Sequence, residues 1–369
     1  MKEIILKNFF QENGIEVPKN FEVKVVKLPS NLDFSQKIYS AKNSNLHADM
    51  KFTFKDPFYS GLTNKFEWAK SALIITYQYK EKNEISLTPK TGQGRIAKFA
   101  EEDFYKPLKE FSKKIETKLE KESILFTTFI DNPNHYDRMF FESSGLGWQG
   151  KSTMMLSPGI GPWMLIATIY VSENFQPDKI KKFSCGSCNL CQISCPTGAL
   201  DEEYQLDSNK CISYWLQSPQ TIPYKMRIAI GNRLYGCDEC LLSCPPGQDS
   251  TKIEIKSTKA NIDLAEILDM SDNELLEKFY WFYIPKRDAD FIRRNAIIVS
   301  ANNINNSLEV KLLEKFVHFS ENLKLYIIWA FWRFGKLNNL EKFIKNSNFM
   351  NETYLNEIQK LKMMKLEAL

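Results

Sequence analysis

Eight cysteines fall within one short stretch of the chain, and this clustering constrains the possible fold more than any other feature of the sequence. All of them lie between Cys185 and Cys244 of the 369 residues, and the long flanks contain none. A secreted disulfide framework would instead spread its pairs through a short chain. Thiols clustered in this way indicate a metal site.

The spacing of the cysteines indicates which kind of metal site this is. Residues 185–196 read C-x2-C-x2-C-x3-C-P, the signature of ferredoxin clusters, and residues 237–245 repeat its C-x2-C-x3-C-P half. Cys211 completes a set of eight thiolates, enough for two four-iron clusters. The proline turns the chain so that the fourth cysteine of a motif reaches the other cluster. This rule predicts one cluster on Cys185, Cys188, Cys191 and Cys244, and the other on Cys195, Cys211, Cys237 and Cys240.

Zinc is the alternative occupant, because C-x2-C pairs also hold Zn²⁺ tetrahedrally. Zinc sites, however, need neither the third cysteine at x2 spacing nor the terminal Cys-Pro, so the pattern favours iron. Two neighbouring clusters form a path for electrons. The sequence contains no haem C-x-x-C-H motif and no nicotinamide fingerprint that could accept electrons at the end of this path. The electrons must therefore end in the N-terminal region or in a partner.

Length and composition limit the class of protein. A chain of 369 residues allows two or three domains, and 43% apolar with 25% charged residues excludes disorder as the main state. No apolar run approaches the roughly 18–20 residues that span a bilayer, and the first residues become polar too soon for a secretory segment. We therefore expect a cytoplasmic protein without a membrane partner. The net charge of +4 is compatible with a nucleic-acid partner but does not predict one.

The region before the cysteines has the pattern of an α/β domain. Three apolar runs predict strands at Ala72–Tyr79, Ile124–Ile130 and Trp163–Val171, and residues 103–119 have the spacing of an amphipathic helix. The Gly-rich residues 142–156 fit neither a phosphate loop nor a dinucleotide fingerprint, and their glycines would let the backbone approach something bulky.

The region after Gly247 shows helical periodicity and no strand alternation, which predicts an all-helical region. Segments from Phe291 and from Lys324 both have the pattern of core helices that end in an Asn- or Gly-containing turn. Stacked helical hairpins and an ordinary bundle both fit this pattern.

Together these motifs resemble the epoxyqueuosine reductases, cobalamin- and iron–sulfur-dependent enzymes of the last step of queuosine synthesis in tRNA. The resemblance is carried by GRIAKFAEEDFY from Gly94, Asp131 fourteen residues before GLGWQGKST, CGSCNLCQISCPTGAL, CISY from Cys211, GNRLYGCDEC from Gly231 and RNAIIVSANN from Arg294. Their order and spacing cover nearly the whole chain.

The resemblance implies three domains: a cobalamin-binding α/β domain at residues 1–175, a ferredoxin-like domain with two 4Fe-4S clusters at 176–255, and a helical, HEAT-like tRNA-binding region at 256–369. It also implies tRNA as partner, an external low-potential electron donor and a monomer. Asp131 falls where the family has its proton donor. The cofactor-binding residues that carry over are Lys55, Asp131, Gly150, Lys151, Ser152, Met155, Ser213 and Asp238.

Alternatives and departures from the family pattern remain at several points. Without the resemblance, Asp131 would be interpreted as a turn or N-cap residue, because Asp-Asn-Pro is also a turn signal. The chain departs from the family pattern D-S-A-P-V after Asp131, where it reads DNPNHYDRMF, and after the last cysteine, where CPPGQ replaces CPWN. His135, in the first of these segments, is expected to be solvent-exposed rather than a cobalt ligand. The function alternatives are a dehalogenase-like corrinoid reductase and an electron-transfer module without catalysis.

Phosphate contacts with tRNA are expected from lysines and arginines of the cluster and helical regions. The candidates are Arg227, Arg233, Arg293 and Arg294, each of which has an ordinary surface or ion-pair alternative.

Overall fold

The computed structural model describes residues 3–28, 35–50, 65–81, 84–248, 255–303, 306–347, 349 and 351–364. The chain divides into two compact units, and each unit is built from three segments. The first unit contains residues 1–84, 103–209 and 239–254, and the second contains residues 85–102, 210–238 and 255–369. The division at residues 175 and 255 that the resemblance implies stays a prediction.

A four-stranded antiparallel sheet forms the centre of the first unit, in the order β1-β2-β8-β5. Its strands are β1 (Phe21–Lys27), β2 (Ser71–Gln78), β8 (Met164–Val171) and β5 (Phe126–Ile130). The three predicted strands are present with small shifts at their ends, and β1 was not predicted. The mixed α/β content expected of this region is confirmed, although every pairing in this sheet is antiparallel.

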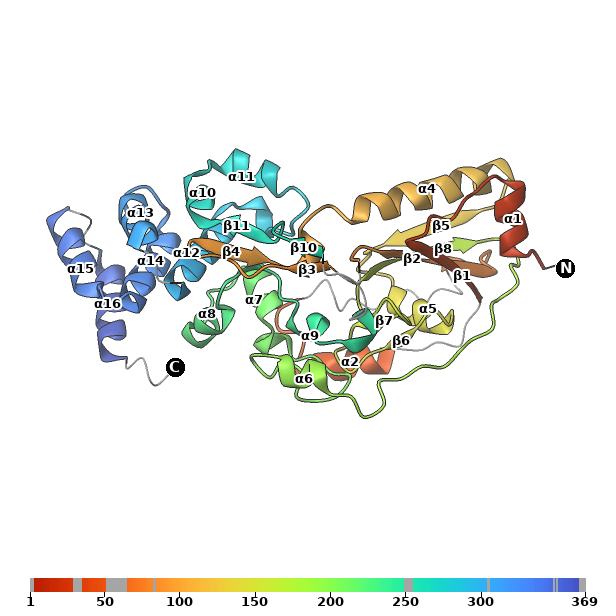
Figure 1. Ribbon diagram of the computed structural model, residues 1–369, viewed down its shortest axis with the longest axis horizontal. Helices are drawn as coiled ribbons and strands as arrows, with labels where there is room; N and C mark the ends of the chain where they lie inside the picture. Colours follow the sequence, from red (N-terminus) through yellow and green to blue (C-terminus); the bar gives the residue numbers. More distant parts are fainter. Residues whose placement is uncertain are drawn as a thin grey trace. The chain divides into compact units, whose positions relative to one another are not determined.

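Helices cover both faces of this sheet (Figure 1). On one face α4 (Tyr105–Lys121), the predicted amphipathic helix, buries Leu108, Phe111 and Ile115 against the strands, and α1 (Leu6–Glu12) packs into the same core. On the other face α5 (Asp137–Ser143) buries its phenylalanines against β2 and β8. Because β2 is covered on both sides, its residues are buried without alternation.

The rest of the first unit consists of short elements around the cysteine motifs. They are α2 (Ser35–Asn43), β6 (Trp148–Gln149), β7 (Met155–Leu156), α6 (Leu190–Ser194), α9 (Glu239–Leu242) and the 3-10 turn Pro245–Gly247. α6 and α9, which come from the two cysteine motifs, pack against each other.

Short strands lie within the C-terminal region that we expected to be all helical, so that prediction is wrong in this detail. β10 (Ile255–Ser257) pairs with β3 (Glu84–Ser86), and β11 (Asn261–Asp263) joins a sheet of order β11-β4-β9 with β4 (Gln93–Ile96) and β9 (Arg233–Tyr235). Strands of three residues are too short to show alternation, and their partners lie far away in the sequence.

Helices make up most of the second unit. They are α7 (Ile212–Gln217), α8 (Tyr224–Ile230), α10 (Leu264–Asp269), α11 (Asp272–Lys278), α12 (Asp290–Asn302), α13 (Asn306–Phe316), α14 (Glu321–Arg333), α15 (Leu337–Asn346) and α16 (Glu352–Met363). The two predicted core helices are α12 and α14, which pack on each other. A HEAT-like repeat stays a prediction. Among the described residues, no helix has the length and apolarity needed to span a membrane.

Candidate functional site

The first cysteine motif folds as a turn followed by a short helix. The backbone N–H of Cys188 donates to the Cys185 carbonyl at 3.1 Å, and α6 ends at Cys195. Two N–H groups donate to the sulfurs: the indole Nε1 of Trp148 to Cys185 Sγ at 3.4 Å, and the backbone of Ala199 to Cys195 Sγ at 3.3 Å. Hydrogen bonds of this kind stabilise negative charge on sulfur and tune the potential of a cluster.

The last cysteine of the second motif lies beside the first motif. Burial, followed by the charges of Cys185, Cys191 and Cys188, raises the pKa of the Cys244 thiol to about 12. Burial also raises the pKa of the Cys191 thiol, and the charges of Cys185 and Cys188 add to this effect. Thiolates in such a group repel one another. A bound cation offsets this repulsion, and coordination to a metal deprotonates a thiol outright. These four thiols therefore act on one another's charge, and their assignment to one cluster stays a prediction.

The second predicted ligand set draws on both units. Cys195 and Cys240 belong to the first unit, whereas Cys211 and Cys237 belong to the second. All eight thiols are half-buried. The assignment of this set stays a prediction.

The Gly-rich segment forms a tight two-stranded ribbon of β6 and β7. A Cβ on Gly147 would lie 1.9 Å from the Leu156 carbonyl oxygen, and one on Gly150 would lie 2.7 Å from the Leu156 side chain. The ribbon therefore requires glycine for contacts within the protein. We expected the glycines to admit something bulky, and at these two positions the close neighbour is the chain itself.

The predicted cofactor residues in this ribbon are engaged inside the protein. The buried Lys151 ammonium pairs with Glu203 at 2.6 Å, and Met155 lies in the core between the sheet and α5. The buried Ser152 hydroxyl accepts from the Met154 N–H at 3.4 Å. Lys55 lies outside the described residues.

The two predicted cofactor residues of the second unit also have protein partners. Ser213 Oγ accepts from Gln217 Nε2 at 3.1 Å. Asp238 is buried, and its Oδ2 accepts from the backbone N–H of Lys98 at 2.5 Å. Asp238 thereby fixes the 3-10 turn Lys98–Ala100.

Asp131 directly follows β5, at the end of the strand where the sequence placed it. Its φ of +48° lies in the left-handed region, which is uncommon for aspartate. The Asx-turn bond of this loop comes from Asn132, whose Oδ1 accepts from the Asn134 N–H at 2.9 Å, and no described residue hydrogen-bonds the Asp131 carboxyl. The interpretation of Asp131 as the turn-forming side chain therefore finds no support in the described residues.

The surroundings of Asp131 favour its protonated form. The residue is exposed to solvent, although protein crowds its carboxyl enough that desolvation raises its pKa above the usual range. The charge of Asp137 raises this pKa further, whereas Lys109 and Arg138 lower it. Arg138 also donates to the Thr153 carbonyl at 3.0 Å, which links α5 to the Gly-rich ribbon.

His135 is buried, so the expectation that it would be exposed is wrong. Its ring is sandwiched between Phe129 and Phe140, with centroids 4.2 and 5.1 Å away and interplanar angles of 9° and 13°. Nδ1 lies 2.9 Å from Asp137 Oδ1, and Nε2 lies 2.7 Å from the Tyr170 hydroxyl. Both ring nitrogens therefore have partners within the protein.

Three of the four arginines expected on tRNA are buried, and for them that expectation is wrong. The Arg227 guanidinium lies over the rings of Tyr326 and Trp329, 4.2 and 5.4 Å from their centroids. Arg294 is 1% exposed, and it donates to the backbone carbonyls of Trp215, Leu216, Ser218 and Gln220.

The other two arginines also bond to the second unit itself. Arg293, likewise buried, pairs with Asp272 and Asp290 at 2.5 and 3.2 Å. Arg233 is half-buried and donates to the Ala229 and Ile230 carbonyls near the end of α8. Sequence alone shows these residues as charges and does not show the aromatic rings and carbonyls that cover them.

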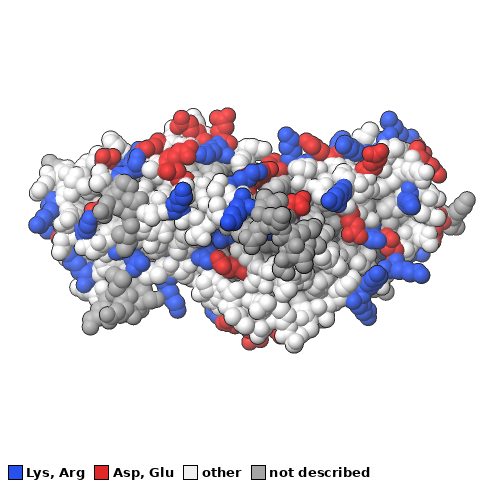
Figure 2. Space-filling view, in the orientation of Figure 1, with Lys and Arg blue, Asp and Glu red and all other residues white. Residues whose placement is uncertain are grey.

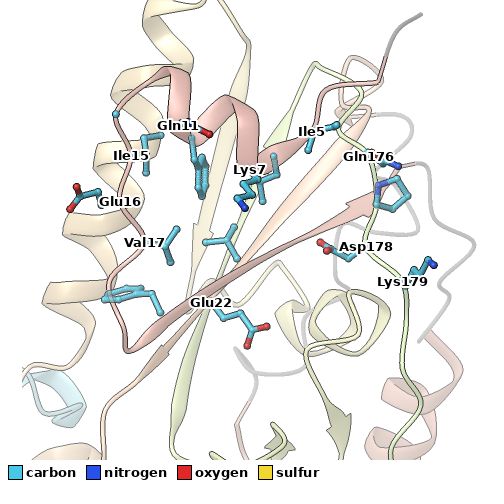
Figure 3. Close-up of a pocket in the computed structure, with 16 residues that line it drawn as sticks. Ile5, Lys7, Gln11, Ile15, Glu16, Val17, Glu22, Gln176, Asp178 and Lys179 are labelled. Carbon is cyan, nitrogen blue, oxygen red and sulfur yellow. The ribbon is translucent and has the colours of Figure 1, made fainter.

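An open groove of about 880 Å³ lies elsewhere in the first unit (Figure 3). It is lined by α1, β1 and residues 176–179, and it contains none of the predicted site residues. β1 is an edge strand, and Asp178 accepts a hydrogen bond from the Val25 N–H at 3.4 Å. We therefore place the candidate site at Asp131 and the cysteines, not in this groove.

A family model, curated relatives and solved structures all show similarity between this chain and one kind of protein. A family model described as a 4Fe-4S double cluster binding domain matches residues 184–247. An epoxyqueuosine reductase of Francisella cf. novicida (strain Fx1) is 30% identical over 314 residues, covering 78% of this chain and 85% of the relative. One of Bacillus anthracis is 30% identical over 263 residues, covering 68% and 69%.

A solved structure shows the same fold. It is the crystal structure of epoxyqueuosine reductase with a tRNA-Tyr epoxyqueuosine-modified stem loop, which superposes with a TM-score of 0.82 at 24% identity and covers 96% of this chain and 97% of that chain. Selenomethionine-labelled epoxyqueuosine reductase gives a TM-score of 0.80 at 24% identity.

Proposed function

Because the chain belongs to the epoxyqueuosine reductase family, we propose that it removes the epoxide oxygen of epoxyqueuosine in the anticodon loop of tRNA and leaves queuosine. The reaction takes up two electrons and two protons, breaks both C–O bonds of the epoxide, forms a C=C bond and releases water. The relatives of this chain are epoxyqueuosine reductases. This similarity favours the tRNA enzyme over a dehalogenase-like enzyme that acts on a small molecule.

Electrons reach the site through the cysteine region. The 4Fe-4S double cluster binding domain covers residues 184–247, where the cysteines would hold clusters that supply one-electron transfer from an external low-potential donor. The grouping of Cys244 with the three thiols of the first motif supports the crossed ligand assignment. Six of the eight cysteines belong to the same compact unit as Asp131: Cys185, Cys188, Cys191, Cys195, Cys240 and Cys244.

Asp131 is the proposed proton donor. The residue is exposed and its carboxyl is free of hydrogen bonds from described residues, so a substrate oxygen can approach it. Desolvation and the charge of Asp137 raise its pKa, so it keeps a proton to higher pH than an ordinary aspartate. Burial and the charges of Asp131 and Asp137 also raise the pKa of Tyr105, so this phenol stays neutral nearby. This observation of an exposed acid with a raised pKa carries the proposal.

Cobalamin is the proposed electron carrier at the end of this path, because the resemblance implies it, and its cobalt would supply a strongly reducing centre. Three of the predicted cofactor residues are engaged within the protein: Gly150 lies against Leu156, Lys151 pairs with Glu203, and Met155 is in the core. The fit of this group is therefore not supported by these side chains, and its binding rests on the resemblance.

tRNA is the proposed macromolecular partner, bound by a monomer of this chain. On the face shown in Figure 2, lysines and arginines are interspersed with acidic side chains rather than gathered into one basic patch. Since Arg227, Arg293 and Arg294 are buried, the phosphate contacts must come from exposed basic residues. Base extrusion from the loop is the general way for chemistry to reach one base.

Mass analysis of tRNA nucleosides tests the proposal. In a strain that lacks this protein, epoxyqueuosine should accumulate and queuosine should disappear, and the wild-type gene should restore queuosine. The spectrum of the anaerobically purified protein supplemented with cobalamin tests cofactor binding separately. Normal queuosine in the deletion strain would overturn the proposed function, whatever the spectrum shows.

A further inference from the structure

The loop between β5 and α5, which begins at Asp131, contains His135, and a hydrogen-bonded chain of four side chains holds this histidine. Asp137 Oδ1 accepts from the Thr168 hydroxyl at 2.6 Å and lies 2.9 Å from His135 Nδ1, while His135 Nε2 lies 2.7 Å from the Tyr170 hydroxyl. Thr168 and Tyr170 belong to β8, so the chain ties this loop to the central sheet. The proton donor itself takes no part in it.

The direction of the hydrogen bonds follows from the groups present. The Asp137 carboxylate can only accept, so Nδ1 of His135 is the donor to it, and Nε2 accepts a hydrogen bond from the Tyr170 hydroxyl, whose pKa is raised by burial and by the charge of Asp137. The ring proton then resides on Nδ1, from which it points at Asp137. The stacked Phe129 and Phe140 rings fix the plane of the imidazole.

Asp137 is the member of this chain that acts on Asp131, because its charge is among the causes that raise the pKa of the Asp131 carboxyl. The other charged groups that act on Asp131 are Lys109 from α4 and Arg138 from α5, and the titratable Tyr105 of α4 also interacts with Asp131. Neither basic group hydrogen-bonds to Asp137 among the described contacts, so His135 and Thr168 hold its orientation.

We propose that His135 is a positioning residue, which holds the Asp137 carboxylate where its charge acts on the proposed proton donor Asp131. This inference rests on the proposed function. It concerns a position at which the chain departs from the family pattern D-S-A-P-V, since His135 stands where that pattern has valine. The histidine adds a donor that fixes the neighbouring carboxylate, and valine has no such donor.

The pH profile of single-turnover reduction of epoxyqueuosine tRNA by pre-reduced, cofactor-loaded enzyme tests the inference. His135→Val should fold, since the family pattern carries valine at this position. The alkaline limb of the pH profile is the range in which the rate falls as pH rises. In His135→Val this limb should lie about half a pH unit to one pH unit lower than in the wild type. Asp137→Asn should displace the limb in the same direction and further.

Two comparisons separate positioning from packing. Phe140→Leu loosens the same aromatic stack but keeps the bond from His135 to Asp137, so it should lower stability without moving the limb. The double variant H135V/D137N should behave as D137N alone, because His135 acts only through Asp137. An unmoved limb in H135V, or an additional displacement in the double variant, would overturn the inference.

A spectroscopic measurement keeps the inference separate from the proposed function. The chain has only three histidines, so the ¹⁵N signals of His135 can be assigned by their loss in H135V. We expect Nδ1 to carry a proton, and an unprotonated Nδ1 would overturn the inference even in an active enzyme. If the wild type fails to reduce epoxyqueuosine tRNA at any pH, the proposed function fails, and the ring tautomer still decides whether His135 donates to Asp137.

Discussion

The side-chain hydroxyls of Ser194 and Ser243 lie 2.9 Å apart and hydrogen-bond to each other. Each serine directly precedes the last cysteine of its motif, Cys195 or Cys244. Ser194 Oγ also lies 3.2 Å from the Glu239 carbonyl, at the start of α9. The two motifs are therefore joined at equivalent positions, and this bond helps to hold Cys244 beside the thiols of the first motif.

This arrangement predicts the iron content of a cysteine variant. The reconstituted wild type should contain about eight irons per chain, because eight thiolates supply two four-iron clusters. Cys188→Ala should lose about half of the iron, since it removes one of four ligands of a single cluster. Iron and sulfide analysis of anaerobically reconstituted protein measures this.

The neighbouring exposed serine supplies the control for this experiment. Ser187→Ala changes a residue next to Cys188 without removing a thiol, so its iron content should equal that of the wild type. Zinc in the wild type, or only four irons per chain, contradicts the assignment of two clusters.

Trp148 should raise the reduction potential of the cluster that Cys185 helps to hold. Its indole N–H donates to Cys185 Sγ, and such a bond strengthens when reduction adds negative charge to the cluster. Trp148→Phe keeps a ring to stack on Phe183 but removes the donor. The potential of one cluster should fall by roughly 20–60 mV, which corresponds to about 0.5–1.5 kcal/mol for one electron. A redox titration followed by electron paramagnetic resonance measures it.

A second tryptophan gives the matched control. The Trp329 indole N–H in α14 has no hydrogen-bond partner among the described residues, so Trp329→Phe should leave both potentials unchanged. Equal shifts in the two variants, or no shift in Trp148→Phe, would show that the N–H···S bond does not tune the cluster.

Local patterns in the sequence were sufficient for much of the first unit. The runs that became β2 and β8 are long and apolar because the sheet buries them on both faces, and α4 shows its apolar stripe at helical spacing. Asp131 could be placed at a strand end because Ile130 closes a clear apolar run. β1 was missed, although its Val23 and Val25 alternate with Glu22 and Lys24.

Contacts between distant segments could not be predicted in the same way. His135 is buried because it pairs with Tyr170, a core residue thirty-five positions later in the chain. No local sequence pattern shows this contact. Arg227 and Arg294 have the charge expected of tRNA contacts, but rings and carbonyls from other helices enclose them. Trp148 was overlooked because its N–H meets a cysteine that lies thirty-seven residues away. The partners of a charged or polar side chain decide its role, and the fold supplies them.

Arg294 should prove to be a structural residue. Arg294→Met would leave several backbone carbonyls around α7 without donors, so the free energy of unfolding should fall by roughly 3 kcal/mol or more. Urea unfolding monitors this change. The exposed Lys225 is the control, because Lys225→Met should stay within about 0.5 kcal/mol of the wild type.

The salt dependence of tRNA binding distinguishes structural from contacting residues. Affinity of the wild type should fall steeply between low and moderate salt, because each phosphate contact releases counterions. A properly folded Arg294→Met protein should keep the wild-type slope. A reduced salt dependence in Arg294→Met would show that Arg294 contacts a phosphate. A wild-type affinity that does not change with salt would contradict phosphate contacts altogether.

Asp131 is the proposed proton donor, and its amide variant tests this role. Asp131→Asn keeps the shape of the side chain but cannot release a proton, so the chemical step should slow by roughly 10²–10⁴-fold. The raised pKa of Asp131 fixes the sign of the pH dependence: the wild-type rate should fall as pH rises through that pKa, because the carboxyl then loses the proton it must give. The variant should lack this alkaline limb. Because the folded protein disfavours ionisation of this carboxyl, the neutral amide should not lower stability above that pH.

Asn132→Ala is the control, since it removes the Asx-turn bond to Asn134 and should leave the rate within a few-fold of wild type. Near-wild-type turnover in Asp131→Asn, with its clusters intact by absorbance, would remove Asp131 from the mechanism and leave water or a substrate group as the source of the proton.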